Sequence, residues 1–161
     1  MSKLSPRRID YLIAVFKCSK GKGYARQREI IEELGIAKPT ASLMIKKLRE
    51  EGYLEIRERR IFLDKKGEKM IEEALWKHGV LENAFVKLGL SSREACEISW
   101  RILDRVPSKI VERIWRNIGM PDRCPCGYPL PTGGREDILN FEVCKTSDSL
   151  RRYGSDRSKS D

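Results

Sequence analysis

The stretch from Gly35 to Gly52 carries side chains whose types and spacing suit binding to nucleic acid. Apolar residues recur there at helical spacing and predict a helix with one packed face, formed by Ala41, Met44, Ile45 and Leu48. Its other faces carry hydroxyl and basic side chains, which bond base edges and phosphates without holding a helix away from DNA. These residues are Lys38, Thr40, Ser42, Lys46, Lys47 and Arg49. We therefore expect this helix to enter the major groove of double-stranded DNA.

A second group of reactive side chains lies in the Pro- and Gly-rich segment that starts at Met120. Cys124 and Cys126 are separated by one residue, and Cys144 follows further along the chain. Three thiolates of this kind would bind zinc or an iron-sulfur cluster; the alternative is small buried residues in a tight turn. The chain has five cysteines and an N-terminus without a signal-peptide pattern, which argues against a disulfide framework.

The elements around Gly35 to Gly52 predict a winged helix-turn-helix. Residues 27–34 form a shorter amphipathic helix, and Gly35 supplies the turn before the recognition helix. Two short alternating runs, residues 53–57 and 60–63, predict a β-hairpin wing. Five arginines flank the recognition helix at positions where phosphate contacts are common: Arg26 and Arg28 near the start of the bracing helix, and Arg57, Arg59 and Arg60 on the wing.

The rest of the chain predicts helices. Ser5 as cap and Pro6 in the first turn predict the start of the first helix. A long helical pattern over residues 67–88 is followed by patterns over 92–103 and 108–117. Ser91 and Glu94, three residues apart, predict a capping box at the start of the helix over 92–103. The expected fold is mainly α: a winged-helix DNA-binding domain over residues 1–64, then a linker helix and helical dimerisation domain over 65–131. Residues 132–161 form a short extension, flexible from about residue 146.

Charge and hydropathy narrow the function further. Residues 1–63 hold 15 basic and 8 acidic side chains, so +7 of the total net charge of +9 lies on the winged-helix half, as expected for a protein that meets a phosphate backbone. No apolar run approaches membrane-spanning length, which predicts a cytoplasmic protein without a membrane partner. No nucleophile with a paired base is found, so we do not expect an enzyme.

The chain resembles the metal-dependent repressors of the diphtheria-toxin-repressor and manganese-transport-regulator family, in its shorter two-domain form, over roughly residues 6–131. Three motifs carry the resemblance: Lys77-His-Gly-Val-Leu-Glu82, Glu94-Ala-Cys96 and Cys124-Pro-Cys-Gly-Tyr-Pro-Leu-Pro131. The resemblance implies a homodimer that binds Fe²⁺ or Mn²⁺ and a palindromic operator. Metal held between the winged helix and the dimerisation helices then fixes the spacing of the two recognition helices.

The resemblance places metal ligands at only some positions of this chain. Asp10 falls at the first-helix ligand position, whereas Ile13 replaces the acidic ligand of manganese-type members one turn later. His78, the only histidine in the chain, and Glu82 match the ligand pair of the linker helix. Their spacing of four residues puts both side chains on one helical face, as chelation requires.

The next helix departs from the family pattern of a Glu or Cys followed by Glu-His. Aligned without a gap, Cys96 takes the first position and Ser99-Trp100 replaces the Glu-His pair. Either Trp100 fills the cavity, or Arg101 substitutes its charge for the metal. Further ligands to complete the site come from Cys96, Glu97 or Asp104. With a thiolate among them, the preference shifts from Mn²⁺ toward iron, cobalt or zinc.

The leading hypothesis from the sequence is a homodimeric, metal-responsive repressor of transcription. One alternative is a winged-helix regulator that acts without metal. Another is a sensor or adaptor that binds zinc or an iron-sulfur cluster and uses its winged helix to contact protein. The basic charge of residues 1–63 favours DNA as the partner.

Overall fold

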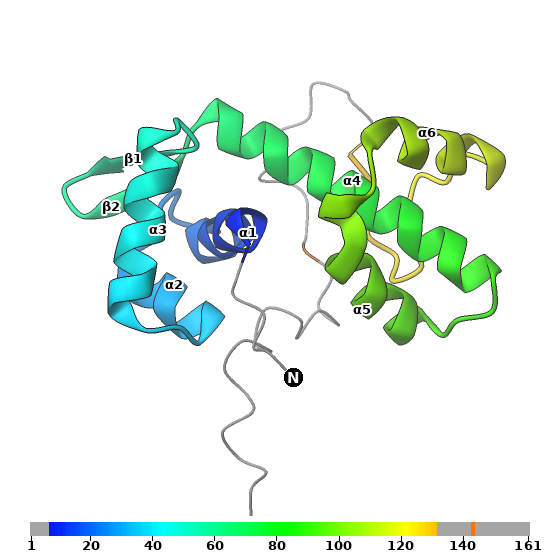
Figure 1. The fold of residues 1–161 in the computed structure, drawn as a ribbon, viewed down its shortest axis with the longest axis horizontal. Coiled ribbons are helices and arrows are strands. Elements are labelled where there is room, and N and C mark those ends of the chain that lie inside the picture. Colours follow the sequence, from blue (N-terminus) through cyan, green and yellow to red (C-terminus); the bar gives the residue numbers. More distant parts are fainter. Residues whose placement is uncertain (1–6, 132–142, 144–161) are drawn as a thin grey trace, which may run out of the picture. The chain divides into compact units, whose positions relative to one another are not determined.

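A computed structural model of the chain describes residues 7–131 and Val143. The described residues form six α-helices, one short 3-10 helix and a two-stranded antiparallel hairpin (Figure 1). They divide into two compact units, and the division falls between Ile71 and Glu72, inside the fourth helix. The predicted fold class is confirmed: mainly α, with a hairpin after the helix-turn-helix and a helical second part.

The first unit is built on α1 (Arg8–Ser19), α2 (Gln27–Leu34) and α3 (Lys38–Glu50). Its core joins side chains from all three helices, including the fully buried Leu12, Phe16, Ile30, Leu34, Ala41 and Leu48. Of the predicted packed face of α3, Ala41, Ile45 and Leu48 are buried and Met44 is half-buried. Gly35 ends α2 with a positive φ of 64°, which a residue with a Cβ adopts only at a cost. The short turn between α2 and α3 depends on this glycine.

Helix α1 begins later than its sequence suggests. The Ser5-Pro6 pair, which predicts a cap and first turn, lies outside the described residues, and the helix starts at Arg8. Asp10 supplies the cap, because its Oδ2 accepts a hydrogen bond of 2.6 Å from the backbone N–H of Arg7. The Arg7 guanidinium also contacts this carboxylate, at 3.2 Å. Asp10 therefore has a structural role at the start of α1.

The wing consists of β1 (Leu54–Arg57) and β2 (Arg60–Leu63), paired with Leu54 opposite Leu63. The two turn residues, Glu58 and Arg59, both have positive φ, 49° and 63°. This is the backbone of a type I′ turn, whose twist matches the strands but which ordinarily uses Asn-Gly. Ala25, in the loop before α2, adds two backbone hydrogen bonds of 2.8 Å to Ile61 and so anchors the wing.

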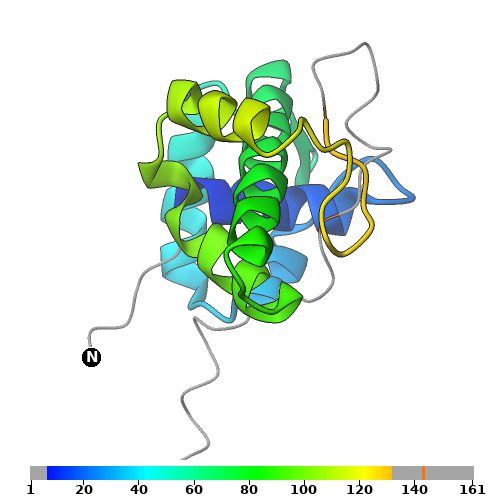
Figure 2. The ribbon, with the colours of Figure 1, turned by 90° about the vertical axis from the view of Figure 1, so that its right-hand side faces the viewer.

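The second unit contains most of α4 (Lys65–Lys87), then α5 (Ser92–Ile102), the 3-10 helix η1 (Leu103–Arg105) and α6 (Ser108–Asn117). Figure 2 looks at these helices from the side, with the loop that follows α6 beside α4. The predicted capping box at the start of α5 is confirmed: Glu94 N–H donates to Ser91 Oγ at 3.2 Å, and Ser91 N–H donates to Glu94 Oε2 at 2.9 Å.

The loop of residues 120–131 packs against α4. A Cβ built on Gly79 would lie 1.9 Å from Leu130 Cδ2, so any side chain at position 79 would force Leu130 to move. Cys124 and Leu130 join Val80 and Val111 in a buried apolar cluster. The Asn83 amide donates a hydrogen bond of 2.8 Å to the Arg123 carbonyl, which ties the loop to α4 at a second point.

None of the helices within the described ranges is both long and apolar enough to cross a membrane.

Candidate functional site

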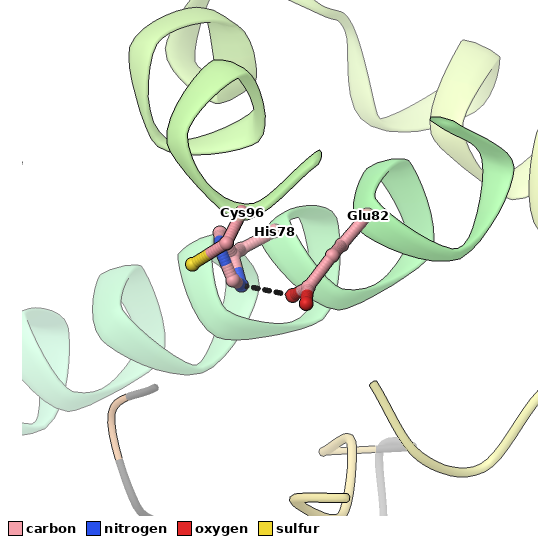
Figure 3. Close-up of side chains that lie close together, drawn as sticks. All are labelled: His78, Glu82 and Cys96. Carbon is pink, nitrogen blue, oxygen red and sulfur yellow. Dashed lines mark hydrogen bonds and ion pairs between the residues drawn. The ribbon is translucent and has the colours of Figure 1, made fainter. Parts of the chain in front are cut away.

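Three potential metal donors meet between α4 and α5. Figure 3 shows His78 and Glu82 on one face of α4, with Cys96 of α5 beside the imidazole. His78 Nδ1 lies 3.5 Å from Glu82 Oε2, and Cys96 Sγ lies 3.5 Å from His78 Nε2. All three side chains are buried, and their donor atoms lie within 4.8 Å of one another. The spacing of four residues on α4 thus brings nitrogen, oxygen and sulfur donors together.

Burial controls the charge of this group. It lowers the pKa of His78 to about 4, against smaller opposing effects of Glu82 and Cys96. The imidazole is therefore neutral near pH 7, which is the form that binds metal. Burial also raises the pKa of Glu82, although His78 and Cys126 favour its anion. A cation beside Glu82 would reverse the effect of burial and hold the carboxylate ionised.

Trp100 lies next to this group. The sequence allowed two interpretations here: that Trp100 fills the space of the missing ligand, or that Arg101 replaces the charge of the metal. The indole of Trp100 stacks on the imidazole of His78, with ring centroids 4.2 Å apart and planes inclined by 26°. Trp100 is buried, whereas Arg101 is exposed. The arrangement favours the first alternative, an indole that fills the space, over a guanidinium that replaces the metal.

Glu82 also belongs to a second group of donors. Cys126 Sγ donates a hydrogen bond of 3.0 Å to Glu82 Oε1, and Cys124 lies in the same group with all donor atoms within 4.8 Å. The sequence paired these two cysteines with Cys144, which lies outside the described residues. The sequence has no local signal that Glu82, 42 positions before Cys124, lies beside Cys124 and Cys126.

Three other predicted ligands have different surroundings. Asp10 belongs to the first unit, where it caps α1 and pairs with Arg7. Glu97 is half-buried on α5, with Oε1 3.5 Å from Arg93 Nε, and Asp104 is exposed on η1. Within the described ranges, the groups of three donors comprise only His78, Glu82, Cys96, Cys124 and Cys126. For Asp10, Glu97 and Asp104 the role of ligand stays a prediction.

The donor groups suit a divalent transition metal. Glu82 is fully buried, and no described residue donates a hydrogen bond to its Oε2, although that oxygen lies 3.5 Å from His78 Nδ1. A buried carboxylate oxygen without a hydrogen bond is costly unless a cation or proton satisfies it. A set of imidazole, carboxylate and thiolate donors favours borderline ions such as Fe²⁺, Co²⁺ and Zn²⁺ over harder ones.

The predicted DNA-contact residues all have exposed side chains in the first unit: Arg26, Arg28, Lys38, Thr40, Ser42, Lys46, Lys47, Arg57, Arg59 and Arg60. Several already have partners within the protein. Arg28 pairs with Glu32 and Arg57 with Glu55, both at 3.1 Å. Phosphates would compete with these exposed ion pairs, which contribute little to stability.

The structure adds two residues to this surface. Gln27 of α2 donates a hydrogen bond of 2.6 Å to Ser42 Oγ of α3, so the hydroxyl is oriented before any ligand is present. Leu43 is 73% exposed, although its neighbours on the packed side of α3 are buried. Leu43 lies off the apolar periodicity of α3, so the sequence pattern alone could have identified it as an exposed apolar residue on the DNA-binding surface.

A winged helix followed by a helical unit with buried nitrogen, oxygen and sulfur donors is the architecture of a metal-dependent regulator. Residues 3–61 match the iron-dependent repressor N-terminal DNA-binding domain, and residues 64–132 match the iron-dependent repressor metal-binding and dimerisation domain. The chain belongs to the iron-dependent repressor family, which confirms the resemblance inferred from its motifs. The family consists of repressors of transcription, not enzymes.

Individual relatives agree with this assignment. The regulator MntR of Listeria welshimeri is 30% identical over 111 residues, which cover 63% of this chain and 78% of the relative. MntR of Escherichia coli O157:H7 is 35% identical over 83 residues, which cover 51% of this chain and 54% of the relative. The chain thus spans about half the length of the Escherichia coli protein.

Solved structures share the fold. A hypothetical protein from Sulfolobus solfataricus superposes with a TM-score of 0.72 at 26% identity, over 80% of this chain and 99% of that one. A manganese-dependent transcriptional repressor in complex with manganese gives a TM-score of 0.70 at 25% identity, over 79% of this chain and 59% of that one.

Proposed function

We propose that this protein is a cytoplasmic repressor of transcription that binds double-stranded DNA as a homodimer in response to a divalent metal. The observation that carries the proposal is the buried group of His78, Glu82 and Cys96, whose donor atoms lie within 4.8 Å of one another. This group lies in the segment that matches a metal-binding and dimerisation domain.

The chain links metal binding to the packing of its dimerisation domain. His78 and Glu82 come from α4 and Cys96 from α5, so one ion held by all three would fix one helix against the other. A bound ion would supply the positive charge that keeps Glu82 ionised without a proton. By fixing α4 against α5, the ion would also make the second unit more rigid. A more rigid second unit favours a single arrangement of the dimer. Two-fold symmetry then sets the distance between two recognition helices.

Helix α3 supplies the contacts to DNA. Thr40 and Ser42 lie near its start and would meet base edges, whereas Lys46 and Lys47 would meet phosphates. The exposed Leu43 adds an apolar side chain that suits the 5-methyl group of thymine. The arginines of the wing, Arg57, Arg59 and Arg60, would contact the flanking backbone.

The donors favour iron over manganese. Manganese-type ligands are hard oxygens, whereas Cys96 supplies sulfur and Ile13 and Ser99 supply no charge. We therefore propose Fe²⁺ as the effector, with Co²⁺ and Zn²⁺ as ions that bind the same group in vitro.

The test is DNA binding with and without metal. Duplexes selected from a random pool by the Fe²⁺-loaded protein are titrated anaerobically, and fluorescence anisotropy reports the affinity. We expect tighter binding with Fe²⁺, loss of that gain in His78→Ala, and a two-fold symmetric selected sequence. Equal affinity with and without metal would instead indicate a metal-independent regulator, and no binding to any duplex would indicate a protein partner.

A further inference from the structure

We infer that Glu82, Cys124 and Cys126 form a second metal site, which takes a borderline divalent ion of the zinc class through two thiolates and a carboxylate. The site is distinct from the proposed effector group of His78 and Cys96 and shares only Glu82 with it. It goes beyond the proposed function, because it needs neither DNA nor a dimer.

The donors are already assembled. Cys126 Sγ lies 3.0 Å from Glu82 Oε1, and the donor atoms of Glu82, Cys124 and Cys126 all lie within 4.8 Å of one another. Glu82 and Cys124 are buried, and Cys126 is half-buried. The ligands could therefore close around one ion with small side-chain movements, and Cys126 leaves the site open toward solvent for entry of the ion.

The backbone holds the two thiols in place without a metal. Gly127 N–H donates to the Cys124 carbonyl at 2.8 Å, and Cys124 N–H donates to the Tyr128 carbonyl at 2.9 Å. Gly127 has a φ of 93°, which closes the turn between these bonds. Packing of Leu130 on Gly79 then fixes the turn against α4, the helix that carries Glu82. A preorganised site of this kind loses little conformational entropy when it binds an ion.

The chemistry of the group indicates the class of ion. Two thiolates favour zinc-class ions over Mg²⁺, Ca²⁺ or Mn²⁺. Together with the carboxylate they fill three of the four positions of a tetrahedral site. The Cys126 thiol donates a hydrogen bond to Glu82 Oε1, so it still carries its proton. Binding would replace each S–H bond by a sulfur–metal bond and release the proton to solvent, with no change of oxidation state.

Glu82 connects the two groups through its two oxygens. Oε1 faces Cys126, whereas Oε2 lies 3.5 Å from His78 Nδ1. One carboxylate can bridge two ions in this way, so the loop site and the effector group are linked by a shared ligand. Loss of Cys126 should therefore affect one ion, and loss of the Glu82 carboxylate should affect both.

The experiment uses the full chain, stripped of metal, reduced, and titrated with Co²⁺ under anaerobic conditions. Thiolate-to-cobalt charge-transfer absorption reports the sulfur ligands, and elemental analysis after gel filtration reports the number of ions held. We expect two ions per chain in the wild type and one in Cys126→Ser. Glu82→Gln should weaken both by roughly tenfold or more.

Matched variants separate the two sites. Cys18→Ser removes a half-buried thiol of α1 that belongs to neither donor group and should bind like the wild type. His78→Ala should lose the effector ion but keep the thiolate absorption of the loop, even if DNA binding is lost. The inference is overturned if Cys126→Ser, folded by circular dichroism, retains the wild-type number of cobalt ions and the same charge-transfer intensity. The same chains tested for metal-dependent DNA binding report separately on the proposed function.

Discussion

The indole of Trp100 on α5 is stacked on the imidazole of His78 on α4, with ring centroids 4.2 Å apart, and both side chains are buried. The family pattern expects a histidine at position 100 and a glutamate at position 99. Ser99 is instead a buried hydroxyl without a hydrogen-bond partner among the described residues. This helix therefore presents Cys96 alone to the metal group, where the family pattern presents three donors.

Restoring the missing donors should restore affinity for a hard ion. We predict that Ser99→Glu combined with Trp100→His increases Mn²⁺ affinity by about tenfold or more, equivalent to about 1.4 kcal/mol. Calorimetric titration measures the affinity. The buried new carboxylate should also make the melting temperature depend on Mn²⁺. Ser92→Glu adds the same charge on the exposed start of α5 and should change neither quantity; an equal gain from this control would exclude the expected role of positions 99 and 100.

The single histidine allows its ionisation to be followed directly. Burial holds the pKa of His78 at about 4 in the folded chain, below the usual 6.5. Between pH 4 and pH 6.5 the imidazole is therefore protonated in the unfolded chain and neutral in the folded chain. This contributes stability that is present above pH 6.5 and is lost as pH falls toward 4. The raised pKa of Glu82 acts in the opposite sense above pH 4.5.

NMR of the imidazole protons should accordingly show a neutral ring in the folded apo protein through pH 6. The same resonances in urea should titrate near pH 6.5. A folded-state midpoint near 6.5 would show that the ring is accessible to water.

Lys46 should contribute affinity without specificity. Lys46→Ala removes one phosphate contact, so the slope of log affinity against log salt should fall by about 1, equally for selected and random duplexes. Lys109→Ala on α6 removes the same charge from an exposed site in the second unit and serves as control. A loss confined to the selected duplex would instead assign Lys46 to base contacts.

Leu43 should distinguish thymine from uracil. If its side chain covers a thymine methyl group, replacing that thymine by uracil should cost the wild type about 0.8 kcal/mol, roughly fourfold in affinity. The same replacement should cost Leu43→Ala nothing. Measuring both proteins on each singly substituted duplex forms a double-mutant cycle. Wild-type affinity that is unchanged by uracil at every position would remove Leu43 from sequence recognition.

Gly79 should be intolerant of a side chain. Gly79→Ala places a methyl group against Leu130 and should destabilise the second unit by about 1–3 kcal/mol, as overpacking typically does. Leu130→Ala in the same chain makes room and should recover part of that loss, which urea unfolding would measure. Additive losses in the double variant would show that the two residues do not touch.

The sequence predicts the elements of this protein better than its site, for physical reasons. Helical periodicity, the Ser91–Glu94 capping box and the alternation in the wing are local signals, and the structure confirms each. Pairing of His78 with Glu82 is also local, because it follows from one turn of helix. Pairing of Glu82 with Cys126 depends on where the loop after α6 returns to α4, and that is set by Leu130 fitting over Gly79. Stacking of Trp100 on His78 depends likewise on how α5 packs.

The tip of the wing has a consequence for laboratory evolution. Positive φ at Glu58 and Arg59 costs roughly 1 kcal/mol at each residue, and Asn-Gly at these positions would remove most of it. Random mutagenesis followed by heat challenge should therefore enrich glycine or asparagine at position 59. The same change deletes a cation from the hairpin. Two selections, one for heat resistance and one for polyanion affinity, would thus drive the same codon in opposite directions, and the residue that survives reports which pressure dominates.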